Sequence, residues 1–83
     1  MASDKNDDKR KPSEELLVVL AKNVKRLREE RKMTQESLGG VCDFHPTFIS
    51  MIERKQRNVT ISTLEIIARA LDVDTYELLT PEN

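Results

Sequence analysis

Residue types that serve enzymes and metalloproteins are scarce in this chain of 83 residues. It has no tryptophan, one cysteine, Cys42, and one histidine, His45. A single cysteine excludes a disulfide within the chain, and one cysteine with one histidine falls short of the about four ligands of a zinc site. Glycine-rich phosphate loops and Ser/His/Asp or Cys/His motifs are absent as well. We therefore expect no enzyme activity, no metal, no cofactor and no small-molecule ligand.

Long apolar runs are also missing from the sequence. No segment approaches the ~18 consecutive apolar residues of a membrane span, and no apolar stretch near Met1 resembles a secretion signal. We expect a soluble protein that stays in the cytoplasm and does not enter a membrane. A chain this short forms one domain with a small core, so association with a second copy would add needed stability.

The chain has no strong excess of either charge, but its charges are segregated. The net charge is -1, yet residues 1–58 hold 13 Lys and Arg against 10 Asp and Glu, whereas residues 59–83 hold 1 against 5. A nucleic-acid-binding surface therefore belongs in the first two thirds of the chain. The acidic last third should face away from phosphate, or toward another protein.

Residues 1–12 are predicted to form a flexible N-terminal arm. After Met1 they contain no large apolar side chain, and they mix both signs of charge, so little could offset the entropy lost on ordering. Lys9, Arg10 and Lys11 could contact a nucleic acid, but a solubilising tail is the preferred interpretation. Residues 13–83 are predicted to form the folded domain.

Apolar residues recur every three or four positions after Ser13, which predicts helices and no strand. The fold class is therefore all-α, a compact five-helix bundle. The helices are expected at about 13–31, 34–42, 45–54, 60–71 and 75–79, with N-caps at Ser13, Thr34, His45, Thr60 and Asp74. The side chains expected to face the core are Leu16, Leu20, Val24, Leu27, Leu38, Val41, Cys42, Phe48, Ile49, Ile52, Leu64, Ile67, Ala68 and Leu71. Lys22, Lys25, Arg26 and Arg28 are expected to form a solvated face.

The second and third predicted helices are short and are separated by a tight turn. A DNA major groove is about 12 Å wide and admits one helix, whose N-terminal side chains reach the base edges. The predicted third helix exposes small polar side chains at its start, Thr47 and Ser50, and basic residues follow its end. This pattern is typical of a helix-turn-helix DNA-binding protein.

Four segments at characteristic spacings carry a resemblance to a known family. They are residues 34–38 (Thr-Gln-Glu-Ser-Leu), 48–54 (Phe-Ile-Ser-Met-Ile-Glu-Arg), 57–60 (Arg-Asn-Val-Thr) and 70–73 (Ala-Leu-Asp-Val). Together they resemble the Cro/C1-type helix-turn-helix regulators, or XRE family, whose fold is the lambda repressor-like DNA-binding domain. The phrase from His45 to Arg54, followed by residues 57–61, is most similar to the controller proteins of restriction-modification systems. The likeness implies a prokaryotic, nucleoid-associated homodimer that regulates transcription on palindromic double-stranded DNA.

The resemblance also implies site residues, position by position. Base-reading positions are occupied by Pro46, Thr47, Ser50, Met51 and Arg54. Positions near the DNA backbone are occupied by Gln35, Phe48, Arg57 and Asn58, with Gln35 also bracing the recognition helix. Glu53 matches an acidic residue of structural role.

The sequence departs from the family pattern at three places. Pro46 stands where Arg or Gln is common, so any base contact there is apolar. Lys55 stands where glycine often closes the helix, so a left-handed backbone there would be strained. Gly39 and Gly40 stand where alanine and a polar residue are usual, which should loosen the second helix.

The last predicted helix carries an apolar cluster, which consists of Tyr76, Leu78 and Leu79. Such a cluster on a terminal helix of a small domain predicts a two-fold dimer interface, although it could instead complete the core. RNA polymerase is a further candidate partner. The alternative function is a helix-turn-helix antitoxin or bridging factor that acts through a protein partner bound to the acidic last third.

Overall fold

The computed structural model describes residues 12–82, so most of the predicted arm, including the Lys9 to Lys11 cluster, lies outside the described part. These residues form four α-helices and one 3-10 helix, with no strand among them. The elements are α1 (Glu14–Glu30), α2 (Gln35–Cys42), α3 (Pro46–Glu53), α4 (Ile61–Leu71) and η2 (Thr75–Leu79). All-α architecture is confirmed, and each helix boundary lies close to its prediction.

The prediction of a fifth α-helix is wrong, because residues 75–79 form a 3-10 helix. Its backbone bonds join residues three apart, as in the 3.0 Å bond from the Glu77 N–H to the Asp74 carbonyl. The Glu77 carboxylate also accepts from the Asp74 N–H at 3.1 Å. Pro81 lies two residues after Leu79 and has no N–H to donate, while the Glu77 and Leu78 carbonyls bond the Asn23 side chain, so α-helical pairing does not extend through the segment.

Side-chain caps explain why the four α-helices begin where they do. Each cap accepts a hydrogen bond from an N–H of the first helical turn, which has no partner inside the helix. The caps are Ser13, Thr34, His45 and Thr60, and the bonds are 3.1, 2.9, 3.0 and 3.1 Å long. These four predicted caps are confirmed, and His45 acts through Nδ1 just before Pro46.

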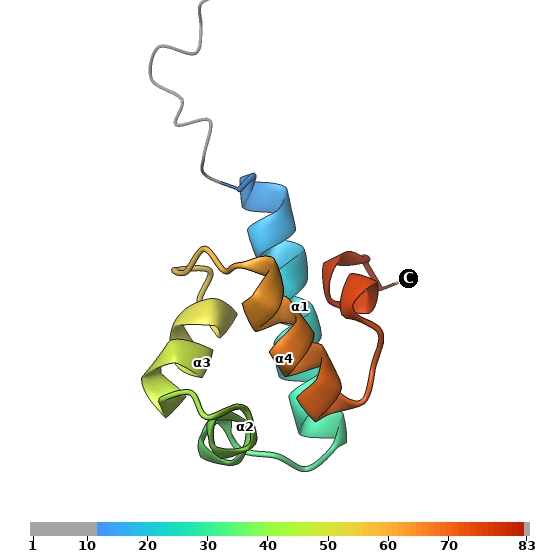
Figure 1. The fold of residues 1–83 in the computed structure, drawn as a ribbon. Coiled ribbons are helices and arrows are strands. Elements are labelled where there is room, and N and C mark those ends of the chain that lie inside the picture. The colour runs from blue at the N-terminus through green and yellow to red at the C-terminus, as the bar shows by residue number, and fades with distance from the viewer. Residues whose placement is uncertain (1–11, 83) are drawn as a thin grey trace, which may run out of the picture.

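Every helix contributes to one core. Figure 1 shows α2 and α3 side by side at one end of the molecule, and η2 beside α1. The buried apolar side chains are Leu20, Val24, Leu27, Leu38, Cys42, Ile49, Ile52, Leu64, Ile67, Ala68, Leu71 and Leu78. Two side chains predicted for the core lie outside it, because Leu16 is 43% exposed and Val41 is 64% exposed.

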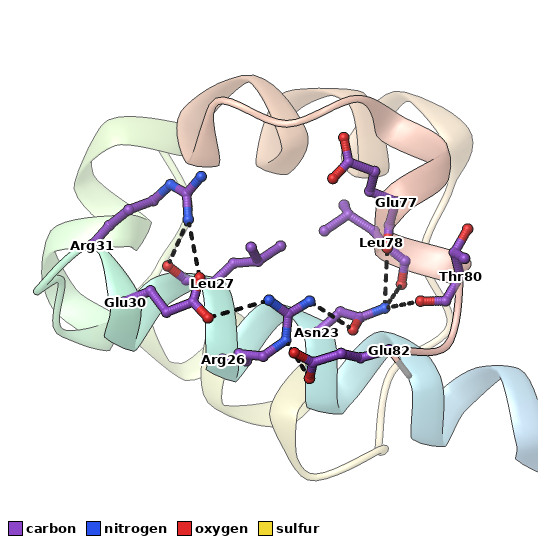
Figure 2. A network of polar contacts seen from close by, with 9 residues as sticks. All are labelled: Asn23, Arg26, Leu27, Glu30, Arg31, Glu77, Leu78, Thr80 and Glu82. Carbon is purple, nitrogen blue, oxygen red and sulfur yellow. Dashed lines mark hydrogen bonds and ion pairs between the residues drawn. The ribbon is translucent and has the colours of Figure 1, made fainter.

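Asn23 of α1 ties the C-terminal segment to the rest of the fold (Figure 2). Its side chain is 2% exposed, and its Nδ2 lies 2.9 to 3.1 Å from the carbonyl oxygens of Glu77, Leu78 and Thr80. Arg26 donates to the Asn23 Oδ1 at 3.2 Å and pairs with Glu82 at 2.9 Å. The network bonds carbonyl groups at the end of η2 and just after it, where a helix leaves such groups short of partners in its own backbone.

Four non-glycine residues have positive φ, and each follows or ends an α-helix. They are Lys32, Asp43, Lys55 and Asp72, with φ between 59° and 64°. Asp tolerates this left-handed conformation better than Lys does. The backbone at Lys55 is left-handed, which is the condition under which strain is expected there, and a 2.8 Å bond from the Gln56 N–H to the Met51 carbonyl closes the helix at this point.

Candidate nucleic-acid interface

One face of α3 collects the predicted base-reading residues. Ile49 and Ile52 are 0% and 1% exposed and fix the inward side of the helix. Positions three, four and seven residues apart share a helix face, so the other side presents a set of accessible side chains, which are Thr47, Ser50, Met51 and Arg54. This face is short, polar at its start and basic at its end, so it carries side chains that can bond base edges in a major groove.

Pro46 occupies the first position of α3 and is half-buried. Its fixed φ suits a helix start, and its missing N–H would have no helical partner there. The presence of proline at position 46 is therefore explained by the start of α3, without any contact with DNA. The N-terminal end of α3 still leaves the exposed Thr47 free to approach a ligand.

The turn between α2 and α3 needs glycine at position 39. The Phe44 N–H donates to the Gly39 carbonyl at 2.8 Å, and a Cβ on Gly39 would lie 2.7 Å from the Phe44 oxygen. Gly40 has no atom within 4 Å of such a Cβ. Gly39 thus permits the close packing of the two helices, a role that the sequence did not reveal.

A buried ion pair holds α3 against α1. The Arg28 Nε and Nη2 donate to the two Glu53 carboxylate oxygens at 2.7 and 2.9 Å, and Nη1 donates to the Met33 carbonyl at 2.9 Å. The side chains are 11% and 5% exposed. Hydrogen bonding to Glu53 raises the pKa of Arg28 above its ordinary value despite the opposing effect of burial. The prediction that Arg28 lies on a solvated face is therefore wrong.

Gln35 joins the same network from α2. Its Nε2 donates to the Glu53 Oε1 at 3.1 Å, so Glu53 receives bonds from α1 and α2 together. The side chain of Gln35 is half-buried. This contact provides the brace that the sequence predicted, while the predicted phosphate contact of Gln35 stays a prediction.

The loop after α3 carries further basic and polar groups. Arg57 and Asn58 are exposed, and they follow Arg54 within a few residues of the C-terminal end of α3. The Arg57 guanidinium carbon lies 5.4 Å from the ring centroid of Phe48. Phe48 in turn contacts Phe44, with ring centroids 5.1 Å apart and planes inclined by 70°.

Cys42 is buried and free, and burial raises the pKa of its thiol. Within residues 12–82 no three His, Cys, Asp or Glu side chains gather where a metal could bind. No helix of that same part is long and apolar enough to cross a membrane.

The helix-turn-helix family HTH_3 matches residues 24–78, a span that includes the whole of α2, α3 and α4. The chain belongs to this family.

Individual members of the HTH_3 family are similar over most of their length. Control protein C.SmaI from Serratia marcescens is 45% identical over 62 residues, which make up 75% of this chain and 74% of that protein. The crystal structure of hypothetical transcription factor NHTF from Neisseria has a TM-score of 0.79 at 39% identity and covers 84% of this chain and 82% of its own. The restriction-modification controller protein C.Esp1396I, solved as a tetramer with its natural 35 base-pair operator, has a TM-score of 0.70 at 40% identity, covering 77% and 88%. The predicted resemblance to controller proteins is confirmed, and these relatives are regulators, not enzymes.

The C-terminal end of this HTH_3 protein requires one correction. Leu78 is 0% exposed inside the protomer, so it completes the core and cannot contact a partner. Tyr76 is 68% exposed and Leu79 is half-buried, so both remain available at the surface. The sequence alone could not show that Leu78 points into the core while Tyr76 and Leu79 remain at the surface.

Proposed function

We propose that this HTH_3 protein is a sequence-specific transcription regulator that binds a palindromic operator as a homodimer. The α3 helix of each subunit would enter one of two successive major grooves, with half-sites ~34 to 36 Å apart. The observation that carries the proposal is the outward face of α3, presented by a helix that Glu53 ties to both α1 and α2. The similarity to a controller protein solved on its operator supports it.

Within this proposal the residues divide by role. The base-reading set is Thr47, Ser50, Met51 and Arg54, with an apolar contribution from Pro46. The backbone set is Gln35, Phe48, Arg57 and Asn58. Base contacts give specificity, whereas contacts with phosphate give affinity and make it fall with added salt.

The dimer is proposed to form through the surface around Tyr76 and Leu79. Tyr76 exposes a large ring on an end of the molecule that carries acidic neighbours, so it is unsuited to DNA. The charge-introducing variant Tyr76→Glu should shift a sedimenting dimer toward monomer and weaken operator binding. Unchanged sedimentation at micromolar concentration would place the interface elsewhere.

Selection of bound duplexes from a random pool, at about 150 mM salt, tests specificity and symmetry together. An enriched palindrome with half-sites about one turn apart is expected. No enrichment would overturn the proposal and favour the alternative, an antitoxin or bridging factor that binds a protein through the acidic last third.

Matched arginine variants locate the surface on the molecule. Arg54→Ala with Arg57→Ala should weaken operator binding by at least ~10-fold and reduce the steepness of its salt dependence. Arg69→Ala, on α4 in the acidic part of the chain, is the control and should bind as the unmodified protein does. Equal affinity of all three proteins would remove α3 and its following loop from the interface.

Action on DNA implies residence at the nucleoid, in the cytoplasm of a prokaryotic cell. RNA polymerase would be a partner wherever the operator lies beside a promoter. The sign of regulation then depends on the position of the operator relative to the polymerase.

A further inference from the structure

An aromatic pair lies between the turn that precedes α3 and the loop that follows it. Phe44 meets Phe48 nearly edge to face, with centroids 5.1 Å apart and a 70° angle between planes. The guanidinium of Arg57 lies 5.4 Å from the Phe48 centroid, on an otherwise exposed side chain. The three groups thus form a row of contacts that begins in the turn and ends at the surface.

We propose that Phe48 is a positioning residue that holds the Arg57 guanidinium ready to bind a DNA phosphate beside α3. This inference rests on the proposed function. A cation within about 6 Å of a ring centroid is attracted by the negative face of the ring. A long side chain held in this way loses less freedom when it meets its ligand, so binding is stronger than for a freely rotating arginine.

The geometry suits a residue that is held and yet remains able to bind. The guanidinium carbon of Arg57 lies over the Phe48 ring, and a cation–π attraction does not require its N–H donors, so these stay available to phosphate oxygens. Arg28 shows the opposite arrangement, because its donors are directed to Glu53 and Met33 inside the fold. Among the ion pairs within residues 12–82, none involves Arg57.

The Phe48 ring is itself held in place. It extends from α3, whose inward side is fixed by fully buried Ile49 and Ile52. Phe44 packs against it from a turn whose backbone is tied to Gly39 by a 2.8 Å bond. The position of Arg57 is therefore coupled to the helix-turn-helix itself, although Arg57 lies in the loop beyond it.

A double-mutant cycle on operator affinity tests the proposal. Phe48→Leu, which keeps apolar bulk but has no ring face, should weaken binding about two- to five-fold per subunit. In an Arg57→Ala background the same change should have almost no effect, because the group that Phe48 positions is gone and leucine keeps the apolar bulk that lies near the DNA backbone. In an Arg54→Ala background, the matched control, the loss should persist in full, since the cation–π contact found within residues 12–82 involves Arg57 and not Arg54.

A ring-fluorinated phenylalanine at position 48 separates positioning from packing. Fluorine withdraws charge from the ring face and nearly preserves the shape, so affinity should fall while the melting temperature stays the same. This variant also serves if Phe48→Leu does not fold.

Each other result is decisive. An equal loss from Phe48→Leu with and without Arg57, or full affinity of the fluorinated protein, would overturn the role of Phe48 and leave the proposed function intact. Failure of the unmodified protein to bind any specific duplex would overturn the proposed function, and the inference with it.

Discussion

Burial controls the chemistry of Cys42 more than its sequence neighbours do. The side chain is 6% exposed, and desolvation raises the pKa of its thiol above the ordinary value. The thiolate is the nucleophilic form, so at neutral pH this cysteine is protonated and shielded. Iodoacetamide should alkylate the native protein far more slowly than the protein in urea. Similar rates in both conditions would contradict the buried position.

The same shift predicts how stability depends on pH. The unfolded thiol has a pKa of about 8.5, and the folded pKa lies higher, so the full stability is present below the unfolded value. As pH rises through the raised folded pKa, this contribution is lost, because the unfolded state releases its proton first. Urea unfolding between pH 7 and 10 should show the decline, and Cys42→Ala should remove it. The pKa of Tyr76 is also raised, chiefly by the charge of Asp74. Its contribution to stability is therefore also lost as pH rises, but at higher pH. Comparison with Tyr76→Phe measures that contribution.

Glu53 ties α3 to both α1 and α2, through Arg28 and Gln35. Glu53→Gln leaves the Arg28 charge buried without its counter-charge, so we expect a loss of about 3 kcal/mol in the free energy of unfolding. Urea denaturation measures it. Replacing Arg28 by Met and Glu53 by Leu together should cost less than the sum of the two single changes, since no charge is then left unpaired. A Glu53→Gln protein within about 0.5 kcal/mol of the original would show that the ion pair does not hold α3.

At the scale of elements, we expect alanine substitutions at the two adjacent glycines of α2 to change stability in opposite directions. Gly39→Ala places a Cβ 2.7 Å from a backbone oxygen of Phe44, so α2 and α3 must move apart and the protein should lose ~1 to 3 kcal/mol of stability. Gly40→Ala meets nothing within 4 Å and should stabilise the helix by up to ~1 kcal/mol. Thermal unfolding of the two variants side by side checks both. Two changes of the same sign would refute the packing role of Gly39.

These glycines also show which elements could be predicted from sequence. Helix starts were predictable because a cap such as Thr34 or His45 acts on its own first turn, within three residues. Gly39 could not be separated from Gly40, because the contact that distinguishes them comes from the next helix. The 3-10 form of residues 75–79 was missed for a similar reason, since the Glu77 and Leu78 carbonyls of that segment pair with Asn23, more than fifty residues away in sequence.

At the scale of the whole molecule, α1 joins two ends with different tasks. Arg28 ties it to α3, which carries the proposed DNA face, and Asn23 ties it to η2 in the acidic last third of the chain. Sequence reasoning identified the residues on the outer face of α3 through a local motif. It placed both Arg28 and Leu78 on the surface, because their buried positions depend on partners that only the assembled fold brings near.

This division predicts that the two ends can be weakened separately. Asn23→Ala removes the donor shared by three carbonyls, so the C-terminal segment should detach, at a cost of about 1 to 3 kcal/mol. Hydrogen exchange should rise in residues 75–82 and stay low in α2 and α3, and the proposed dimer should weaken because Tyr76 loses its fixed position. Lys25→Ala is the control, since this residue of α1 is exposed and takes part in none of the ion pairs within residues 12–82. If Asn23→Ala instead raised exchange evenly through all five elements, the protein would unfold as a single unit and α1 would not divide it into separable ends.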